Sequence, residues 1–98
     1  MNRTSSIKRL YWLGDFRNIE FADVINDIPE EVALNPELMG EIRLLQLLQI
    51  EWAYRQYHKM IEKLPYDKNI DYAIKELEDQ RSLVTKSITE KLKTKNGG

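Results

Sequence analysis

The longest amphipathic segment of the chain is residues 36–64, with the sequence PELMGEIRLLQLLQIEWAYRQYHKMIEKL. It begins as helices often begin, with Asn35 at the N-cap, Pro36 as the first helical residue and Glu37 in the first turn. Pro65 follows the segment, and a proline disfavours the helical conformation of the residue before it. We therefore predict one long helix over residues 36–64.

Two apolar stripes run along this predicted helix at spacings of three and four residues. The first consists of Leu47, Ile50, Tyr54, Tyr57, Ile61 and Leu64. The second consists of Leu38, Ile42, Leu45, Leu48, Trp52 and Met60. A helix with one stripe lies against one neighbour, whereas two stripes make a wide face that needs two neighbours. Residues 44–48 are apolar almost all round, so we expect them at the centre of the molecule.

A second helix is predicted over residues 69–92, where acidic residues crowd the first half and basic residues the second, as the helix dipole favours. Its apolar stripe has the heptad-like spacing of a coiled coil, with one polar interruption at Arg81. The connection between the two helices is short, so we expect them to pack as an antiparallel helical hairpin. Residues 93–98 are polar and end in two glycines, and we expect them to form a disordered tail.

Residues 7–28 are predicted to form a β-hairpin with its tip near Gly14. Residues 7–13 are rich in aromatic and branched side chains, and residues 17–21 alternate polar and apolar. An isolated hairpin is marginally stable in water, so it must pack on the helices or pair with a copy in another chain. The alternative is a short helix over residues 5–13 and another over 21–28, which makes the chain all-α.

The hairpin interpretation gives a single domain over residues 1–98. Its fold class is α+β and mostly helical, with an N-terminal β-hairpin followed by a long antiparallel two-helix hairpin. The formal net charge is only −1, but the charges are segregated along the chain. Residues 1–17 hold four basic residues and one acidic residue, whereas residues 18–41 hold seven acidic residues and no basic one. We expect these opposite charges to pair across the strands of the hairpin.

The composition excludes several classes of functional site. The chain has no cysteine, which excludes a disulfide scaffold, a thiol nucleophile and a cysteine-based zinc or iron–sulfur site. The single histidine, His58, excludes a centre with several histidines from one chain. We therefore expect no enzymatic activity, no metal and no cofactor. Neither a membrane-spanning segment nor a secretory signal is evident, so we expect a cytoplasmic protein that does not act at a membrane.

The wide face of the long helix predicts association with another chain. It carries large aromatic side chains of the kind that is enriched at interfaces, and a single helical hairpin cannot cover all of them. We expect a homodimer or higher oligomer with a four-helix core, and a second protein as a further partner. The predicted interface residues are Leu45, Leu48, Trp52, Tyr54, Tyr57 and Ile61. The leading hypothesis is a small, non-enzymatic accessory protein for protein–protein interaction or assembly.

A second hypothesis comes from the N-terminal segment, where cations and flat aromatic rings occur close together. Aromatic side chains can stack on bases while arginine and lysine contact phosphates. The residues concerned are Lys8, Arg9, Tyr11, Trp12 and Arg17. This pattern predicts a nucleic-acid-binding regulatory protein. The acidic residues 18–41 would lie beside that surface and repel phosphate.

Overall fold

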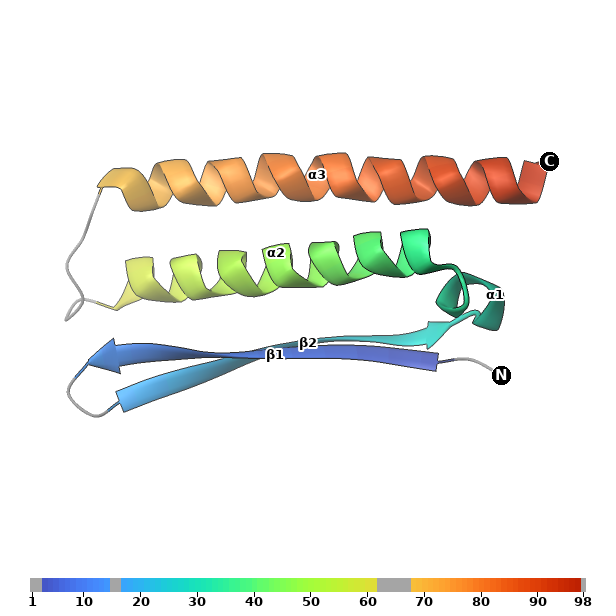
Figure 1. The fold of residues 1–98 in the computed structure, drawn as a ribbon. Helices are drawn as coiled ribbons and strands as arrows, with labels where there is room; N and C mark the ends of the chain where they lie inside the picture. The colour runs from blue at the N-terminus through green and yellow to red at the C-terminus, as the bar shows by residue number, and fades with distance from the viewer. Residues whose placement is uncertain (1–2, 15–16, 62–67, 98) are drawn as a thin grey trace.

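The fold consists of a β-hairpin, one long helix against it and a second long helix on the far side (Figure 1). The computed structural model describes residues 3–14, 17–61 and 68–97. The strands are β1 (Arg3–Gly14) and β2 (Arg17–Ile28), and the helices are α1 (Glu30–Ala33), α2 (Pro36–Met60) and α3 (Lys68–Gly97). The predicted α+β, mostly helical fold is confirmed, and the all-α alternative is wrong.

The hairpin is longer than predicted. Both strands have twelve residues, and β1 begins at Arg3, ahead of the predicted start at residue 7. The antiparallel register places Ser6 opposite Val24 and Trp12 opposite Asn18. Alternating polar and apolar residues favour the strand over a helix through residues 21–28, because each strand then has one face for α2 and one for the opposite side.

The expected pairing of opposite charges across the strands is not found in direct register. Lys8 lies opposite Ala22 and Arg9 lies opposite Phe21, while Glu20 lies opposite Leu10. Register is set by the apolar residues that face α2, and a slip of one residue would turn all of them away. As a result, these charged residues lie opposite apolar residues instead of opposite each other.

Helix α2 begins as predicted and ends earlier than predicted. The Asn35 side chain accepts hydrogen bonds from the backbone N–H groups of Glu37 and Leu38, at 3.1 and 3.3 Å. The helix ends at Met60 instead of Leu64, because the backbone of Ile61 is extended. Its N–H donates to the His58 carbonyl in a tightened last turn. The predicted stop at Pro65 lies outside the described residues.

Helix α3 continues to Gly97, so the expected disordered tail from residue 93 is a further difference from prediction. Lysine is a good helix former, and Lys91 and Lys93 suit the negative end of the helix dipole. Short helix α1, which was not predicted, buries Val32 in the main core. That core lies where all layers meet and contains Ile28, Val32, Leu38 and Ile42, with Ile88 and Leu92 of α3 packed against it.

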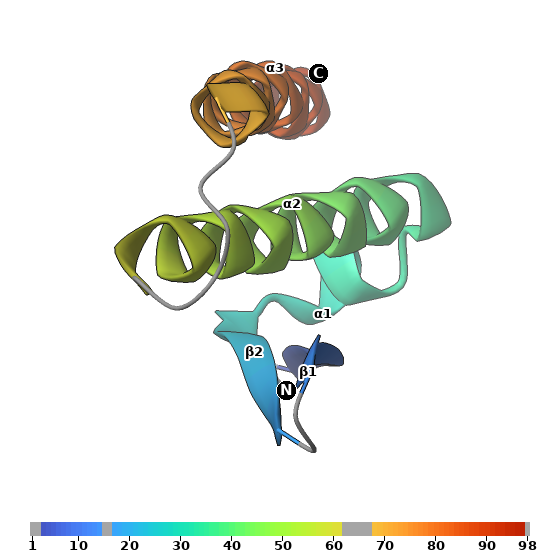
Figure 2. The ribbon, with the colours of Figure 1, turned by 90° about the vertical axis from the view of Figure 1, so that its left-hand side faces the viewer.

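The molecule is elongated and thin. Figure 2 shows the layers from one end, with α2 between α3 and the hairpin. The radius of gyration is 16.2 Å, against about 13 Å for a compact domain of this length. The accessible surface is 7194 Å², whereas a compact monomer of 11.6 kDa exposes about 5,800 Å². The chain therefore exposes about 1,400 Å² more than its mass requires.

Candidate interaction surface

The hairpin covers the first apolar stripe of α2. The ring of Tyr54 stacks on Tyr11 of β1, with centroids 3.9 Å apart and planes 7° from parallel. Phe21 of β2 meets Tyr54 and Tyr57 edge to face, at 6.4 and 6.0 Å. Two of the predicted interface residues, Tyr54 and Tyr57, are thus half-buried against their own hairpin.

Helix α3 packs against most of the second stripe, although Met60 at its end is 77% exposed. Leu48 is buried, and the guanidinium of Arg81 lies 5.2 Å from the ring centre of Trp52. Arg81 also donates a hydrogen bond to Gln49 at 2.7 Å, which explains a polar residue within the apolar stripe of α3. The two neighbours that the sequence requires for α2 are both supplied by the same chain. The predicted interface residues therefore do not form one open face.

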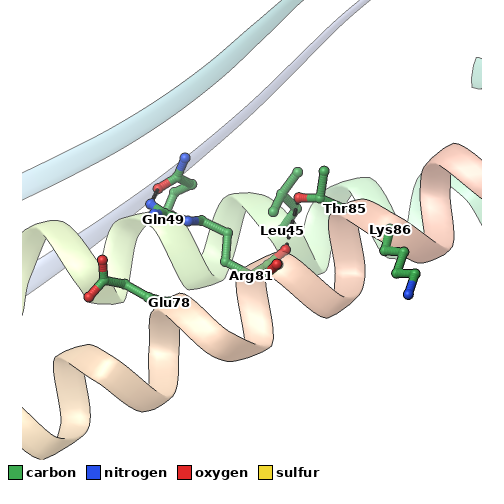
Figure 3. A pocket seen from close by; sticks show the side chains of 7 residues that line it. Leu45, Gln49, Glu78, Arg81, Thr85 and Lys86 are labelled. Carbon is green, nitrogen blue, oxygen red and sulfur yellow. Dashed lines mark hydrogen bonds between the residues drawn. The ribbon is translucent and has the colours of Figure 1, made fainter.

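The remaining predicted interface residues lie at the margins of these contacts. Leu45 is half-buried and lines a polar groove between α2 and α3, and Ile61 is half-buried beyond the end of α2. Figure 3 shows this groove, which has a volume of about 560 Å³ and is also lined by Gln49, Glu78, Arg81, Ser82, Thr85 and Lys86. Two polar side chains of the groove are already hydrogen-bonded within the chain, since Arg81 donates to Gln49 and Thr85 donates to the backbone carbonyl of Arg81.

A buried glutamine fastens α2 to both strands. Gln46 has no exposed surface. Its carbonyl accepts from the Ser5 hydroxyl at 2.7 Å, and its amide donates to the backbone carbonyls of Ser5 and Asp23 at 2.9 and 3.1 Å. Because Gln46 is fully buried and its amide needs partners there, these three hydrogen bonds fix the hairpin on the helix.

The predicted nucleic-acid residues do not lie on one face. Arg9 forms an ion pair with Glu51 of α2 at 3.4 Å, and the Tyr11 hydroxyl donates to the same carboxylate at 2.7 Å. Lys8, Trp12 and Arg17 are exposed. Alternation along β1 explains why these residues lie on two different faces, because successive side chains of a strand point to opposite faces of the sheet.

Tyr11 gives the hairpin contact a pH dependence. Burial and the hydrogen bond to Glu51 raise the pKa of Tyr11 from 10.0 to about 12. Since the folded pKa exceeds the unfolded one, the neutral phenol stabilises the fold below pH 10.0, and this contribution is lost between pH 10.0 and about 12.

We expect the free energy of unfolding, measured with urea, to fall less steeply over that range for Tyr11→Phe than for the native chain. Equal slopes in the two proteins would contradict this role of Tyr11.

The outward face of the hairpin carries exposed apolar side chains. We call this surface the outer hairpin face and define it by Lys8, Leu10, Trp12, Glu20, Ala22 and Val24. Leu10 is 63% exposed, Trp12 64% and Val24 52%. The alternation of side chains along β1 places Leu10 and Trp12 on the same side as Lys8, so the sequence itself contains the signal for this exposed face.

Both long edges of the hairpin are open. Within the described part of the chain the sheet has only the strands β1 and β2, so each has a neighbour on one side alone. Each unpaired edge presents backbone N–H and C=O groups that can pair with another strand. A depression of about 210 Å³ lies on the β2 side, between that strand and α2, and Trp52 lines it.

The described residues contain no group of three or more histidine, cysteine, aspartate or glutamate residues that could hold a metal ion. Both ring nitrogens of His58 are buried without a hydrogen-bond partner. Over the same residues, no helix is long and apolar enough to cross a membrane. Comparisons with known protein families, with curated proteins and with solved structures give no match.

Proposed function

We propose that this protein is a small, non-enzymatic assembly module that self-associates through its β-hairpin. The observation that carries the proposal is a sheet of two twelve-residue strands, each with an open edge, whose outer hairpin face exposes Leu10, Trp12 and Val24. Exposed apolar patches beside unpaired strand edges are typical of surfaces that bind other protein chains.

The other surfaces of the molecule support this choice. The aromatic residues Trp52, Tyr54 and Tyr57 of α2 contact the hairpin and α3 of the same chain, so the proposed interface lies on the hairpin instead. The outward face of α3 carries many charged residues, including Lys75, Glu76, Asp79 and Lys86, among which the apolar side chains of Tyr72 and Leu83 are also exposed. Charged residues are depleted from the centres of protein interfaces, so this face is a less favourable interface than the outer hairpin face.

The alternative of nucleic-acid binding has less support. Arg9 and Tyr11 contact Glu51 of α2, so Arg9, although exposed, already has an anionic partner, and Lys8 and Arg17 are the other exposed cations of the predicted set. Glu20 lies on the same outer face as Lys8 and would repel phosphate. A cytoplasmic setting stays part of our proposal.

The double variant Leu10→Ser and Trp12→Ser tests the proposal. It removes the two largest apolar side chains of the outer hairpin face without touching the face that packs on α2. We expect self-association, measured by sedimentation velocity, to weaken about tenfold or more, because each lost apolar contact is worth roughly 1 kcal/mol or more.

The matched control is Leu83→Ser, since Leu83 is 69% exposed on α3. It should sediment as the native chain does. Unchanged association in the double variant would contradict the proposal. Salt-dependent binding of a labelled oligonucleotide by a monomeric chain would favour the nucleic-acid alternative instead.

A further inference from the structure

We infer that the partner is a second copy of this chain, and that β1 of one copy pairs with β2 of the next to continue the sheet. This inference rests on the proposed function and specifies its geometry. Two hairpins could pair through several combinations of edges, and this inference specifies the β1 edge of one copy and the β2 edge of the other. The selection comes from the charges of the two strands.

The two edges carry opposite charge. Strand β1 holds Arg3, Lys8 and Arg9 and no acidic residue. Strand β2 holds three acidic residues, Glu20, Asp23 and Asp27, against the single base Arg17. Pairing β1 with β1, or β2 with β2, would bring like charges together, which destabilises a sheet. Pairing β1 with β2 of another copy brings unlike charges together.

Some of these charged residues form ion pairs within the described part of the chain, and others do not. Arg3 lies near Glu30 and Arg9 near Glu51. Lys8 and Glu20 are exposed, and neither forms an ion pair with another residue that the structure describes. Both belong to the outer hairpin face, so they can meet across an edge between two copies. Lys8 and Glu20 are therefore the charges that we expect to select the partner edge.

The geometry of the layers allows the sheet to continue. Since β1 and β2 are antiparallel, copies placed side by side in the same orientation keep the antiparallel alternation. Two strands occupy about 10 Å across a sheet, and packed helices are about 8–10 Å apart. Each added hairpin thus brings its α2 beside the α2 of its neighbour. Leu44 is 47% exposed and lies two turns before Glu51, on the β1 side, where it would meet that neighbour.

The exposed area fits two contacts on each copy. A standard interface buries roughly 800 Å² on each partner. A chain that uses both edges would bury about twice that area, close to the excess of about 1,400 Å² over a compact monomer. Because the two edges differ, the contact is head to tail. Such contacts produce open chains or closed rings of copies.

Charge exchange tests this geometry directly. Lys8→Glu places an acidic side chain on β1 that would face Glu20 of the next copy, and Glu20→Lys places a basic side chain on β2 that would face Lys8. We expect each variant alone to associate about tenfold more weakly than the native chain at low salt, since one attractive cross-strand pair becomes repulsive. An equimolar mixture of the two variants should regain association, because the glutamate introduced at position 8 of one variant meets the lysine introduced at position 20 of the other.

The matched controls are Lys75→Glu and Glu76→Lys, which change the same charges at exposed sites of α3. Each should associate as the native chain does. Hydrogen exchange gives a second measurement, since edge pairing slows amide exchange in β1 and β2 as the concentration rises. Circular dichroism of each variant establishes that it is folded.

The outcomes separate this inference from the proposed function. Recovery in the mixture supports the pairing of β1 with β2. Stronger association of Lys8→Glu alone would indicate contact between two β1 edges and overturn it. Loss of association in the Leu10→Ser and Trp12→Ser variant, with no effect of either charge exchange, would overturn the edge pairing and retain self-association. A native chain that stays monomeric would overturn both.

Discussion

Ile50→Ala is expected to destabilise the fold by roughly 2–5 kcal/mol. Ile50 is 2% exposed and lies in α2, the middle layer, where it lines the depression beside Phe21 and Ala53. Truncation there removes apolar contacts on the side where the helix meets the hairpin and leaves a cavity that the long α2 cannot close by bending. A chain of this size has a total stability of only about 5–15 kcal/mol, so the loss is a large fraction.

Urea unfolding followed by circular dichroism measures this effect. The comparison must be made at one protein concentration, because association stabilises the folded chain by mass action. The control is Leu83→Ala, at an exposed position of α3, for which we expect a change within about 0.5 kcal/mol. A loss below about 1 kcal/mol in Ile50→Ala would mean that the hairpin does not depend on α2 as described.

Gln46→Leu is expected to cost about 3 kcal/mol, although leucine has nearly the same volume as glutamine. The substitution leaves the Ser5 hydroxyl without its acceptor and the backbone carbonyls of Ser5 and Asp23 without their donor. Each buried group that loses its partner costs about 1–3 kcal/mol, with part of the loss offset by the apolar side chain.

The same unfolding experiment tests this prediction, with Gln80→Leu on the exposed face of α3 as its control. Adding Ser5→Ala to Gln46→Leu should cost less than the sum of the two single changes, because the hydroxyl that lost its acceptor is then removed. Strictly additive losses would show that Ser5 and Gln46 act independently.

The local signals in the sequence predicted most of the elements. Asn35 and Pro36 define the start of α2 because capping depends only on neighbouring residues. The alternation of polar and apolar residues predicted the hairpin for a similar reason, because the two-residue repeat of a strand can be recognised from neighbouring residues alone. The ends of the helices were less predictable. Ile61 leaves the helix before Pro65, and α3 continues beyond residue 92, through a polar segment that nothing in its sequence forbids from being helical.

The partners of each surface could not be predicted in the same way. Two stripes on α2 correctly required two neighbours, but amphipathicity gives the width of an apolar face and not the identity of what covers it. Tyr11 and Phe21 of the hairpin pack on one stripe. Tyr54 and Tyr57, which were predicted to lie at an interface, therefore contact residues of their own chain. Gln46 was a detectable exception, because a polar residue in the apolar run 44–48 requires buried partners.

The most direct test of self-association is the mass of the native chain in solution, measured by sedimentation equilibrium over roughly a hundredfold range of micromolar concentration. We predict an average mass above the 11.6 kDa of one chain, rising with concentration as successive copies pair through their hairpins. A mass that stays at 11.6 kDa throughout the range would contradict the proposal.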